Sequence, residues 1–232
     1  MPRLDCSLVR TYIVDNIMNH PITIGGFTAP DSHFARKAAS VAARAHGNNP
    51  AMLHHVHRSW WFAEFLGKQR GLKYDREVVY IASLLHDLGL TDEFVAHQRF
   101  ETDGAHAARR ILLDEQYSDA KAQLVWEGIA LHSSLGVADL MAPEIALVSL
   151  GAHVDVMGLN YNEISPSLIA DTLELYPRAG FKAAFQEALA QIARTKPLTT
   201  VGTGIVDIGR RYVEGYSIPD VCDLLDHAPF ES

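Results

Sequence analysis

Cysteine is scarce in this chain of 232 residues, which contains only Cys6 and Cys222. Two thiols so far apart in sequence indicate neither a disulfide framework nor a cysteine-rich zinc knuckle, and this usage fits a reducing compartment. No run of 18 or more apolar residues is free of charge, and the first residues contain no apolar signal core. We therefore expect a cytoplasmic protein with no membrane partner.

Basic residues are also in the minority. Lys and Arg number 20 against 28 Asp and Glu, which gives a formal net charge of -8. Because no basic stripe with interleaved aromatic residues appears, a nucleic-acid partner is disfavoured, and we expect a small-molecule substrate. With 48% hydrophobic residues the chain can bury a substantial core, so we expect one domain over residues 1–232.

Strand signals are missing as well. No persuasive alternating strand, Asn-Gly hairpin or internal repeat appears. Nearly every apolar segment has helical spacing, with caps and breakers at its ends, and this predicts an all-α fold. The expected helices cover residues 33–45, 51–69, 75–86, 103–116, 119–134, 143–157, 166–176, 179–194, 203–214 and 219–226.

The adjacent pair His86 and Asp87 follows an apolar run at residues 81–85. Burying an imidazole and a carboxylate at the end of an apolar helix is costly unless a partner compensates, and a metal ion is the commonest such partner. The alternative is a helix-end pair whose carboxylate accepts a hydrogen bond while the imidazole is half-buried. We interpret the pair as a candidate metal site.

Three histidines lie on the helix expected from residue 51, and helical phase separates them. His55 lies beside the apolar face, His54 points to the opposite side, and His57 is offset in the other direction. We favour His55 as the inward-facing imidazole and keep His57 as the alternative ligand.

Two further candidates lie on later helices. Asp155 projects from an apolar face beside Gly151 and Ala152, whose small size leaves room for an ion, although this carboxylate could instead bond a neighbouring helix end. His132 also faces inward, either next to a substrate or as a core histidine that holds a ligand in place. The resulting set has two nitrogens and two oxygens, and it suits one divalent ion, zinc ahead of iron(II) or manganese, with a water completing the shell. Its members are His55, His86, Asp87 and Asp155.

A histidine, then Leu84-Leu85-His86-Asp87-Leu88-Gly89, then a late aspartate, resembles the HD-domain superfamily of metal-dependent hydrolases. Later segments resemble its cyanamide hydratase branch, and Tyr176-Pro177-Arg178 is far more discriminating than the His-Asp pair. These segments cover residues 99–105, 130–133, 143–147 and 176–182, within a likeness that extends from about residue 50 to 200.

This resemblance implies a helical bundle with the metal site in its core. The HD core would cover about residues 50–160, with flanking N- and C-terminal helices. The resemblance also implies that His132 lies beside the substrate and takes part in catalysis together with Asp87. Carried over to this chain, the metal ligands of the family are His55, His86, Asp87 and Asp155.

The chain departs from the family at two places. In two-metal HD proteins a further histidine stands about four residues before a Gly-Ala pair, whereas Phe100 occupies that place here, so we expect one ion. In addition, His54-His55-Val56 stands where cyanamide hydratases have Asn-His-Ser, a difference that concerns the substrate and leaves the metal unaffected.

The resemblance implies a hydro-lyase that hydrates cyanamide or a related small nitrile to urea or the corresponding amide, by means of metal-bound hydroxide. His132 would hydrogen-bond or protonate the nitrile nitrogen. The alternative is a metal-dependent phosphohydrolase acting on a nucleotide or another small phosphoester, which needs cationic partners for the phosphate. Four arginines lie near the motif in sequence, namely Arg58, Arg99, Arg109 and Arg110.

The sequence leaves open whether the protein forms a homodimer.

Overall fold

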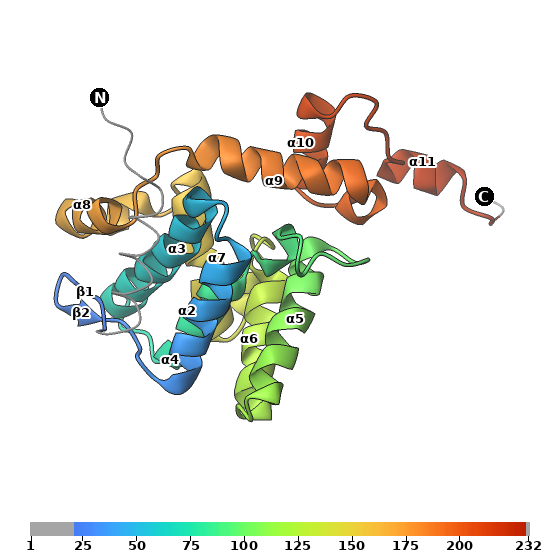
Figure 1. Cartoon of the computed structure of the whole chain (residues 1–232). Coiled ribbons are helices and arrows are strands. Elements are labelled where there is room, and N and C mark those ends of the chain that lie inside the picture. The colour runs from blue at the N-terminus through green and yellow to red at the C-terminus, as the bar shows by residue number, and fades with distance from the viewer. Residues whose placement is uncertain (1–20, 231–232) are drawn as a thin grey trace.

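The computed structural model describes residues 21–230, and over this range it is a helical bundle (Figure 1). The all-α prediction is confirmed, with one small exception described below. None of the described helices combines the length and hydrophobicity needed to cross a bilayer. The helices are α2 (His33–Ala45), α3 (Pro50–Gln69), α4 (Arg76–Leu85), α5 (Phe100–Asp114), α6 (Asp119–Leu131), α7 (Pro143–Met157), α8 (Pro166–Leu175), α9 (Phe181–Thr195), α10 (Ile205–Tyr212) and α11 (Val221–Asp226), with short 3-10 turns η1 (Leu88–Leu90), η2 (Ala138–Leu140), η3 (Tyr161–Glu163) and η4 (Pro197–Thr200).

Helix ends are set by local capping, and most lie close to their predicted places. The side chain of Asp75 accepts hydrogen bonds from the backbone N–H groups at the start of α4, and Ser165 caps α8 in the same way. The clearest differences are that α5 begins at Phe100, three residues before the predicted start, and that α6 ends at Leu131.

The exception to the all-α prediction is an antiparallel hairpin of β1 (Thr23–Ile24) and β2 (Phe27–Thr28). Gly25 and Gly26 join the strands with φ values of 56° and 82°. Two successive residues with positive φ form the tight turn that suits a two-residue hairpin loop. Strands of two residues are too short to show an alternating pattern, which is why the sequence did not predict them.

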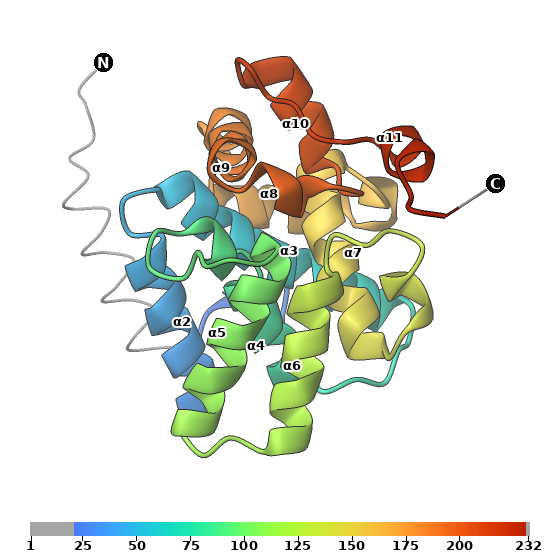
Figure 2. The ribbon, with the colours of Figure 1, turned by 90° about the vertical axis from the view of Figure 1, so that its right-hand side faces the viewer.

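Helix α3 lies at the centre of the bundle, and its residues are buried from Ala51 to Gly67. Helices α4 and α7 pack against it, and α6 packs against both of them. Helices α5 and α6 run side by side as an antiparallel pair (Figure 2). Helix α9 crosses one end of the bundle and contacts α3 (Figure 1).

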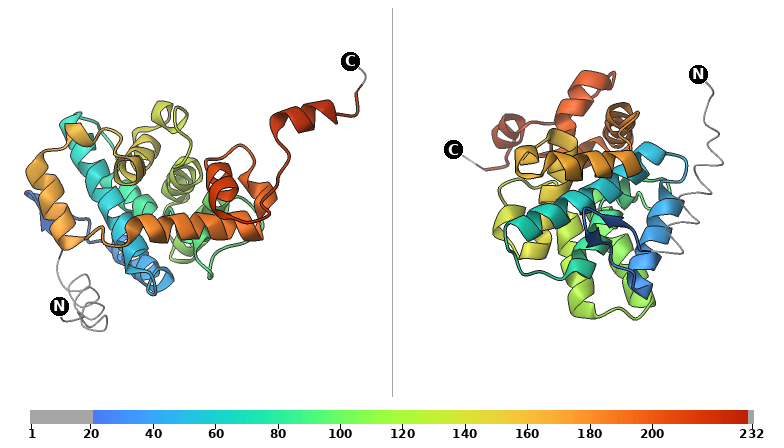
Figure 3. Two further views of the ribbon diagram at one scale, coloured as in Figure 1. Left: turned by 90° about the horizontal axis from the view of Figure 1, so that it is seen from above. Right: turned by 90° about the vertical axis from the view of Figure 1, so that its left-hand side faces the viewer.

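The C-terminal segment extends beyond this bundle. Helix α10 packs against α9, and the chain then leads through α11 away from the other helices (Figure 3). Cys222 on α11 is exposed, whereas Cys6 and the N-terminal residues examined for a signal lie outside the described residues.

Gly151 allows α7 to approach α3 unusually closely. A Cβ atom at this position would lie 2.1 Å from the carbonyl oxygen of Ser59 and 2.9 Å from Cβ of Ala63. The space beside Gly151 is therefore filled by α3, and the expectation that this small residue leaves room for an ion is wrong. Its small size instead brings the Asp155 end of α7 up to α3.

Candidate metal centre

Three polar side chains meet where α3 passes the end of α4. His55 belongs to α3, His86 caps the C-terminal end of α4, and Asp87 follows directly. Each is at most 1% exposed. One potential ligand atom from each lies within 4.8 Å of the others. The structure thus brings together three of the four predicted metal ligands.

Both imidazoles turn their Nε2 atom towards this cluster, and these two atoms lie 3.1 Å apart. Nδ1 of His86 lies 2.7 Å from the carbonyl oxygen of Ser83, and Nδ1 of His55 lies 2.7 Å from Oδ2 of Asp155. Because these oxygens can only accept, each Nδ1 donates, which leaves each Nε2 as the nitrogen that can bind an ion. Burial, and next the nearby His55, lower the pKa of His86 well below its usual value, which keeps that ring neutral.

Asp87 adds negative charge to the same point. Its Oδ2 lies 3.4 Å from Nε2 of His55 and 3.4 Å from Nε2 of His86. Within residues 21–230 neither of its buried carboxylate oxygens has a hydrogen-bond partner. A buried carboxylate without a hydrogen-bond partner is unfavourable unless a cation lies beside it. Two imidazole nitrogens and a carboxylate oxygen therefore fit a divalent ion such as zinc.

A second close approach fixes the backbone just after these ligands. A Cβ atom on Gly89 would lie 1.9 Å from the carbonyl oxygen of Phe100. Only glycine allows η1 to pack this tightly against the first turn of α5. The end of α4, which carries His86 and Asp87, is thereby held against α5.

Asp155 lies next to the cluster, on the opposite edge of the His55 ring. Its two carboxylate oxygens accept hydrogen bonds from Nε and Nη2 of Arg58, each at 2.8 Å, and Oδ2 also accepts the Nδ1 hydrogen of His55. Burial raises the pKa of Asp155, but the hydrogen bonds from His55 and Arg58 outweigh burial and lower that pKa below its usual range. Asp155 is thus ionised and bonded to other side chains.

His57, the alternative ligand, points elsewhere. Its ring stacks on Tyr176, with centroids 4.7 Å apart and an interplanar angle of 5°. His54 also faces away from the cluster, since its Nδ1 lies 3.2 Å from the carbonyl oxygen of Pro177. Of the three neighbouring histidines, His55 is the one that joins His86 and Asp87.

His132 lies beside the cluster at the end of α6. Its Nδ1 donates to the carbonyl oxygen of Ile129 at 2.7 Å, and its Nε2 lies 3.8 Å from Oδ1 of Asp87. The ring packs edge-on against His86 and Phe100. Burial, and next His86, lower the pKa of His132 to about 4. Near neutral pH His132 therefore offers an unprotonated Nε2 next to Asp87.

Two residues near the centre were missed from the sequence. Glu101 is 1% exposed, and its Oε1 accepts hydrogen bonds from Arg99 at 2.9 Å and from Ser133 at 2.6 Å. His46 is 4% exposed, and its Nε2 has no hydrogen-bond partner in the described part of the chain. Glu101 lies in a segment that resembles the family, which was a signal for it. No sequence pattern indicated His46, because its position near the centre depends on how α2 packs.

Aromatic rings cover the His55 side of the cluster. Phe181, at the start of α9, stacks on the His55 ring with centroids 4.8 Å apart and an interplanar angle of 26°. Phe185, one turn later, lies 5.8 Å from the same ring. The first turns of α9 therefore place an apolar surface next to the metal centre.

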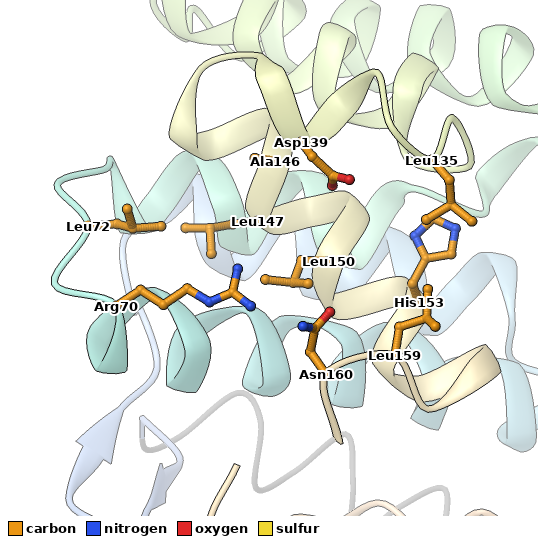
Figure 4. Close-up of a pocket in the computed structure, with 10 residues that line it drawn as sticks. All are labelled: Arg70, Leu72, Leu135, Asp139, Ala146, Leu147, Leu150, His153, Leu159 and Asn160. Atoms are coloured by element: carbon orange, nitrogen blue, oxygen red, sulfur yellow. The ribbon is translucent and has the colours of Figure 1, made fainter. Parts of the chain in front are cut away.

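A separate hollow of about 320 Å³ opens on another face of the molecule (Figure 4). It lies between the C-terminal end of α3, the η2 region and α7, and His153 lines one side of it. The lining residues are Arg70, Leu72, Leu135, Asp139, Ala146, Leu147, Leu150, His153, Leu159 and Asn160. None of the metal-centre residues is among them, so this hollow is distinct from the candidate site.

Two imidazoles and a carboxylate that converge within a helical bundle define a metal-binding helical protein. The sequence profile of the HD domain matches residues 52–169, and the chain belongs to the HD domain family. Members of this family are typically metal-dependent hydrolases, so the match indicates metal-dependent activity of the hydrolase type. Comparison with curated proteins gave no match.

Proposed function

We propose that this protein is a metal-dependent enzyme that adds water to cyanamide or a related small nitrile, with urea or the corresponding amide as product. The observation that carries the proposal is the chemical character of the centre. Aromatic rings pack against His55 and His132, and the arginines near the motif are paired with carboxylates or exposed. A small uncharged substrate suits such surroundings better than a phosphate does.

The ion would be held by Nε2 of His55, Nε2 of His86 and a carboxylate oxygen of Asp87. A divalent ion supplies Lewis acidity, which makes a water molecule a nucleophile near neutral pH. Zinc suits two imidazoles and a carboxylate, with iron(II) and manganese as alternatives. The place where two-metal HD proteins have a further histidine is occupied by Phe100, which packs on His132. This supports one ion per chain.

His132 is the residue placed to move a proton. Because its Nδ1 hydrogen is bonded to Ile129, its Nε2 can take a proton from the attacking water and return it to the nitrile nitrogen, where negative charge develops. Glu101 favours the protonated ring, since its charge raises the pKa of His132 against the larger effect of burial. Nε2 also faces Asp87, which places the proton acceptor beside the metal ligand.

Phosphoester hydrolysis is the alternative that family membership keeps open. A phosphate needs cationic partners, and the arginines near the motif have other contacts. Arg58 is fully buried against Asp155, Arg99 pairs with Glu101, and Arg109 pairs with Asp119. Arg110 is exposed. These pairings support the nitrile as the substrate class.

The decisive experiment measures urea released from cyanamide by purified protein of known metal content. We expect about one divalent ion per chain and urea formation that stops when a chelator is added. Phosphate release from a panel of nucleotides, without urea, would replace the proposal with a phosphohydrolase. Bound metal with neither product would favour a binding protein without turnover, and no bound metal would overturn the proposal.

A further inference from the structure

We propose that residues 217–230, the C-terminal arm, pack on a second copy of this chain, and that two copies exchange their arms. The surface that receives the arm of the other copy consists of η4 and α10. This inference concerns assembly and does not depend on the proposed activity. It assigns a partner to the part of the chain that leads away from the bundle (Figure 3).

Helix α11 has an apolar face that nothing in residues 21–230 covers. Every residue from 221 to 230 is exposed. Val221, Leu224 and Leu225 recur at the spacing that places side chains on one face of a helix, and they are 75%, 53% and 73% exposed. A helix of six residues is marginal in water by itself, because tertiary packing supplies most of the stability of a helix in a protein. The helical form of α11 therefore indicates a surface that packs on this face.

Tyr216 directs the arm away from its own bundle. A Cβ atom on Gly209 would lie 2.5 Å from the Tyr216 ring, so this ring lies directly against α10. The hydroxyl of Tyr216 is hydrogen-bonded to the hydroxyl of Thr200. Ile218 then precedes Pro219, and a residue before proline favours extended backbone. The arm therefore starts in a fixed direction, and its apolar face is left to another chain.

The charge of the arm limits which surface can receive it. Residues 220–230 contain three aspartates and no lysine or arginine. Packing α11 against α11 of the second copy would bring together two segments of like charge, which is unfavourable. The hollow beside η2 is also a poor receiver, because Asp139 lines it and its one arginine, Arg70, is already paired with Glu163.

The surface of η4 and α10 has apolar side chains that the arm can cover. Leu198 of η4 is 70% exposed, and Tyr212 at the end of α10 is 46% exposed. Because η4 packs against α10, these two residues belong to the same part of the molecule. Contact with the apolar face of α11 would remove apolar surface of both copies from water, which favours association.

Two arginines on the same surface complement the acidic arm. Arg210 and Arg211 lie exposed in the last turn of α10, and within residues 21–230 neither forms an ion pair. Asp207 and Glu214 balance their charge, so this surface does not repel the arm as another α11 would, and both guanidinium groups are free to pair with its aspartates. Because each copy has one arm and one receiving surface, the contact forms twice about a two-fold axis, and the assembly closes as a dimer.

The first test measures the dissociation constant of the dimer by sedimentation of the full-length protein over a range of concentrations. The arm variant, Leu224→Asp with Leu225→Asp, should raise this constant at least about 100-fold, because each substitution occurs twice in the dimer and a buried anchor contributes about tenfold or more. Leu140→Asp is the matched control, since Leu140 lies in the η2 region and is 85% exposed, and it should leave the constant unchanged. Protein that stays monomeric at every concentration would overturn the proposal, and so would a dimer that the arm variant weakens no more than the control does.

The second test determines which surface receives the arm. The receiver variant, Arg210→Glu with Arg211→Glu, keeps an intact arm, whereas the arm variant keeps an intact receiving surface, and far-UV circular dichroism checks that both are folded. Each variant alone should be largely monomeric, but an equimolar mixture should form a mixed dimer, because one arm and one receiving surface still match. If the receiver variant alone dimerises as the unaltered protein does, or if the mixture forms no dimer, the arm does not pack on η4 and α10, and the proposal is overturned.

Discussion

Nε2 of His55 lies 3.1 Å from Nε2 of His86, within hydrogen-bonding distance, and the Nδ1 atom of each ring is hydrogen-bonded on its far side. Within residues 21–230 the buried carboxylate of Asp87 beside them has no hydrogen-bond partner, so its charge is uncompensated there. The centre is therefore a source of instability without an ion and of stability with one.

The first prediction concerns removal of the metal. Chelation should lower the melting temperature, and restored zinc should reverse the loss, because only the folded chain presents the three ligands together. Free zinc at 100 times its Kd stabilises the folded state by about 2.7 kcal/mol. Asp87→Asn should abolish this response while stabilising the ion-free protein by about 1–3 kcal/mol, since it removes a buried charge without a partner. Calorimetric scans with and without chelator give both values, and equal responses in the two proteins would contradict the prediction.

The second prediction concerns His132. His132→Gln should lower kcat for cyanamide hydration by about 10²–10⁴-fold, the usual contribution of a positioned proton-transfer group, and should leave the metal content unchanged. His153→Gln is the matched control, because His153 is also 6% exposed but lines the separate hollow. Steady-state assays with metal analysis of each protein test this. A fully active His132→Gln would reduce the role of His132 to packing.

The third prediction concerns the contact of α3 with α7. Gly151→Ala places a methyl group 2.1 Å from the carbonyl oxygen of Ser59, so the helices must move apart, at a cost of about 1–3 kcal/mol or more in the free energy of unfolding. Gly128→Ala is the control, because its new Cβ would meet neighbouring side chains at 3.4 Å and 3.5 Å and alanine favours the helix. Urea unfolding curves compare the two. Equal losses would show that the close approach is not responsible.

The fourth prediction contrasts an ion pair that joins a buried carboxylate to an arginine that is 36% exposed with a pair in which both side chains are exposed. Glu64 is 0% exposed and accepts hydrogen bonds from Nε of Arg76 at 2.8 Å and from Tyr74 at 2.9 Å. Arg76→Met leaves this carboxylate with one partner and should lower the free energy of unfolding by about 1–3 kcal/mol, less than for a fully buried pair because Arg76 is partly exposed to water. Arg70→Met breaks the Arg70–Glu163 pair, whose side chains are 37% and 38% exposed, and should cost at most about 1 kcal/mol. Denaturant titration of both variants measures the two losses of stability. A loss in Arg70→Met equal to or larger than that in Arg76→Met would contradict the prediction.

Much of the fold could be predicted from the sequence because helix boundaries depend on nearby residues. Asp75 and Ser165 cap helices within a few positions of themselves, so their effect is visible in a short window. The Gly25–Gly26 hairpin could not be predicted, because strands of two residues are too short to show alternating apolar and polar residues. The small size of Gly151 is visible in the sequence, but the residue that fills the space beside it, Ser59, lies far away in the sequence and only the packed helices bring it there.

The candidate site, too, could be predicted from the sequence only in part. Helical phase separated His55 from His54 and His57, because the orientation of a side chain on one helix follows from that helix alone. The same argument showed that Asp155 faces inward, but it could not show what Asp155 contacts. Its partners Arg58 and Arg178 come from other segments of the chain, and only the packed structure brings them to the carboxylate.

The pairing of Asp155 with Arg58 also fixes the electric charge at the centre. The buried guanidinium of Arg58 offsets the charge of the Asp155 carboxylate, so the carboxylate of Asp87, which has no hydrogen-bond partner within residues 21–230, would be the charge that opposes a bound divalent ion. A divalent ion would then leave net positive charge at the centre, and the rings of Phe181 and Phe185 beside it would screen that charge far less than water does. A polarisable neutral molecule whose reacting atom gains electron density would be drawn to this point.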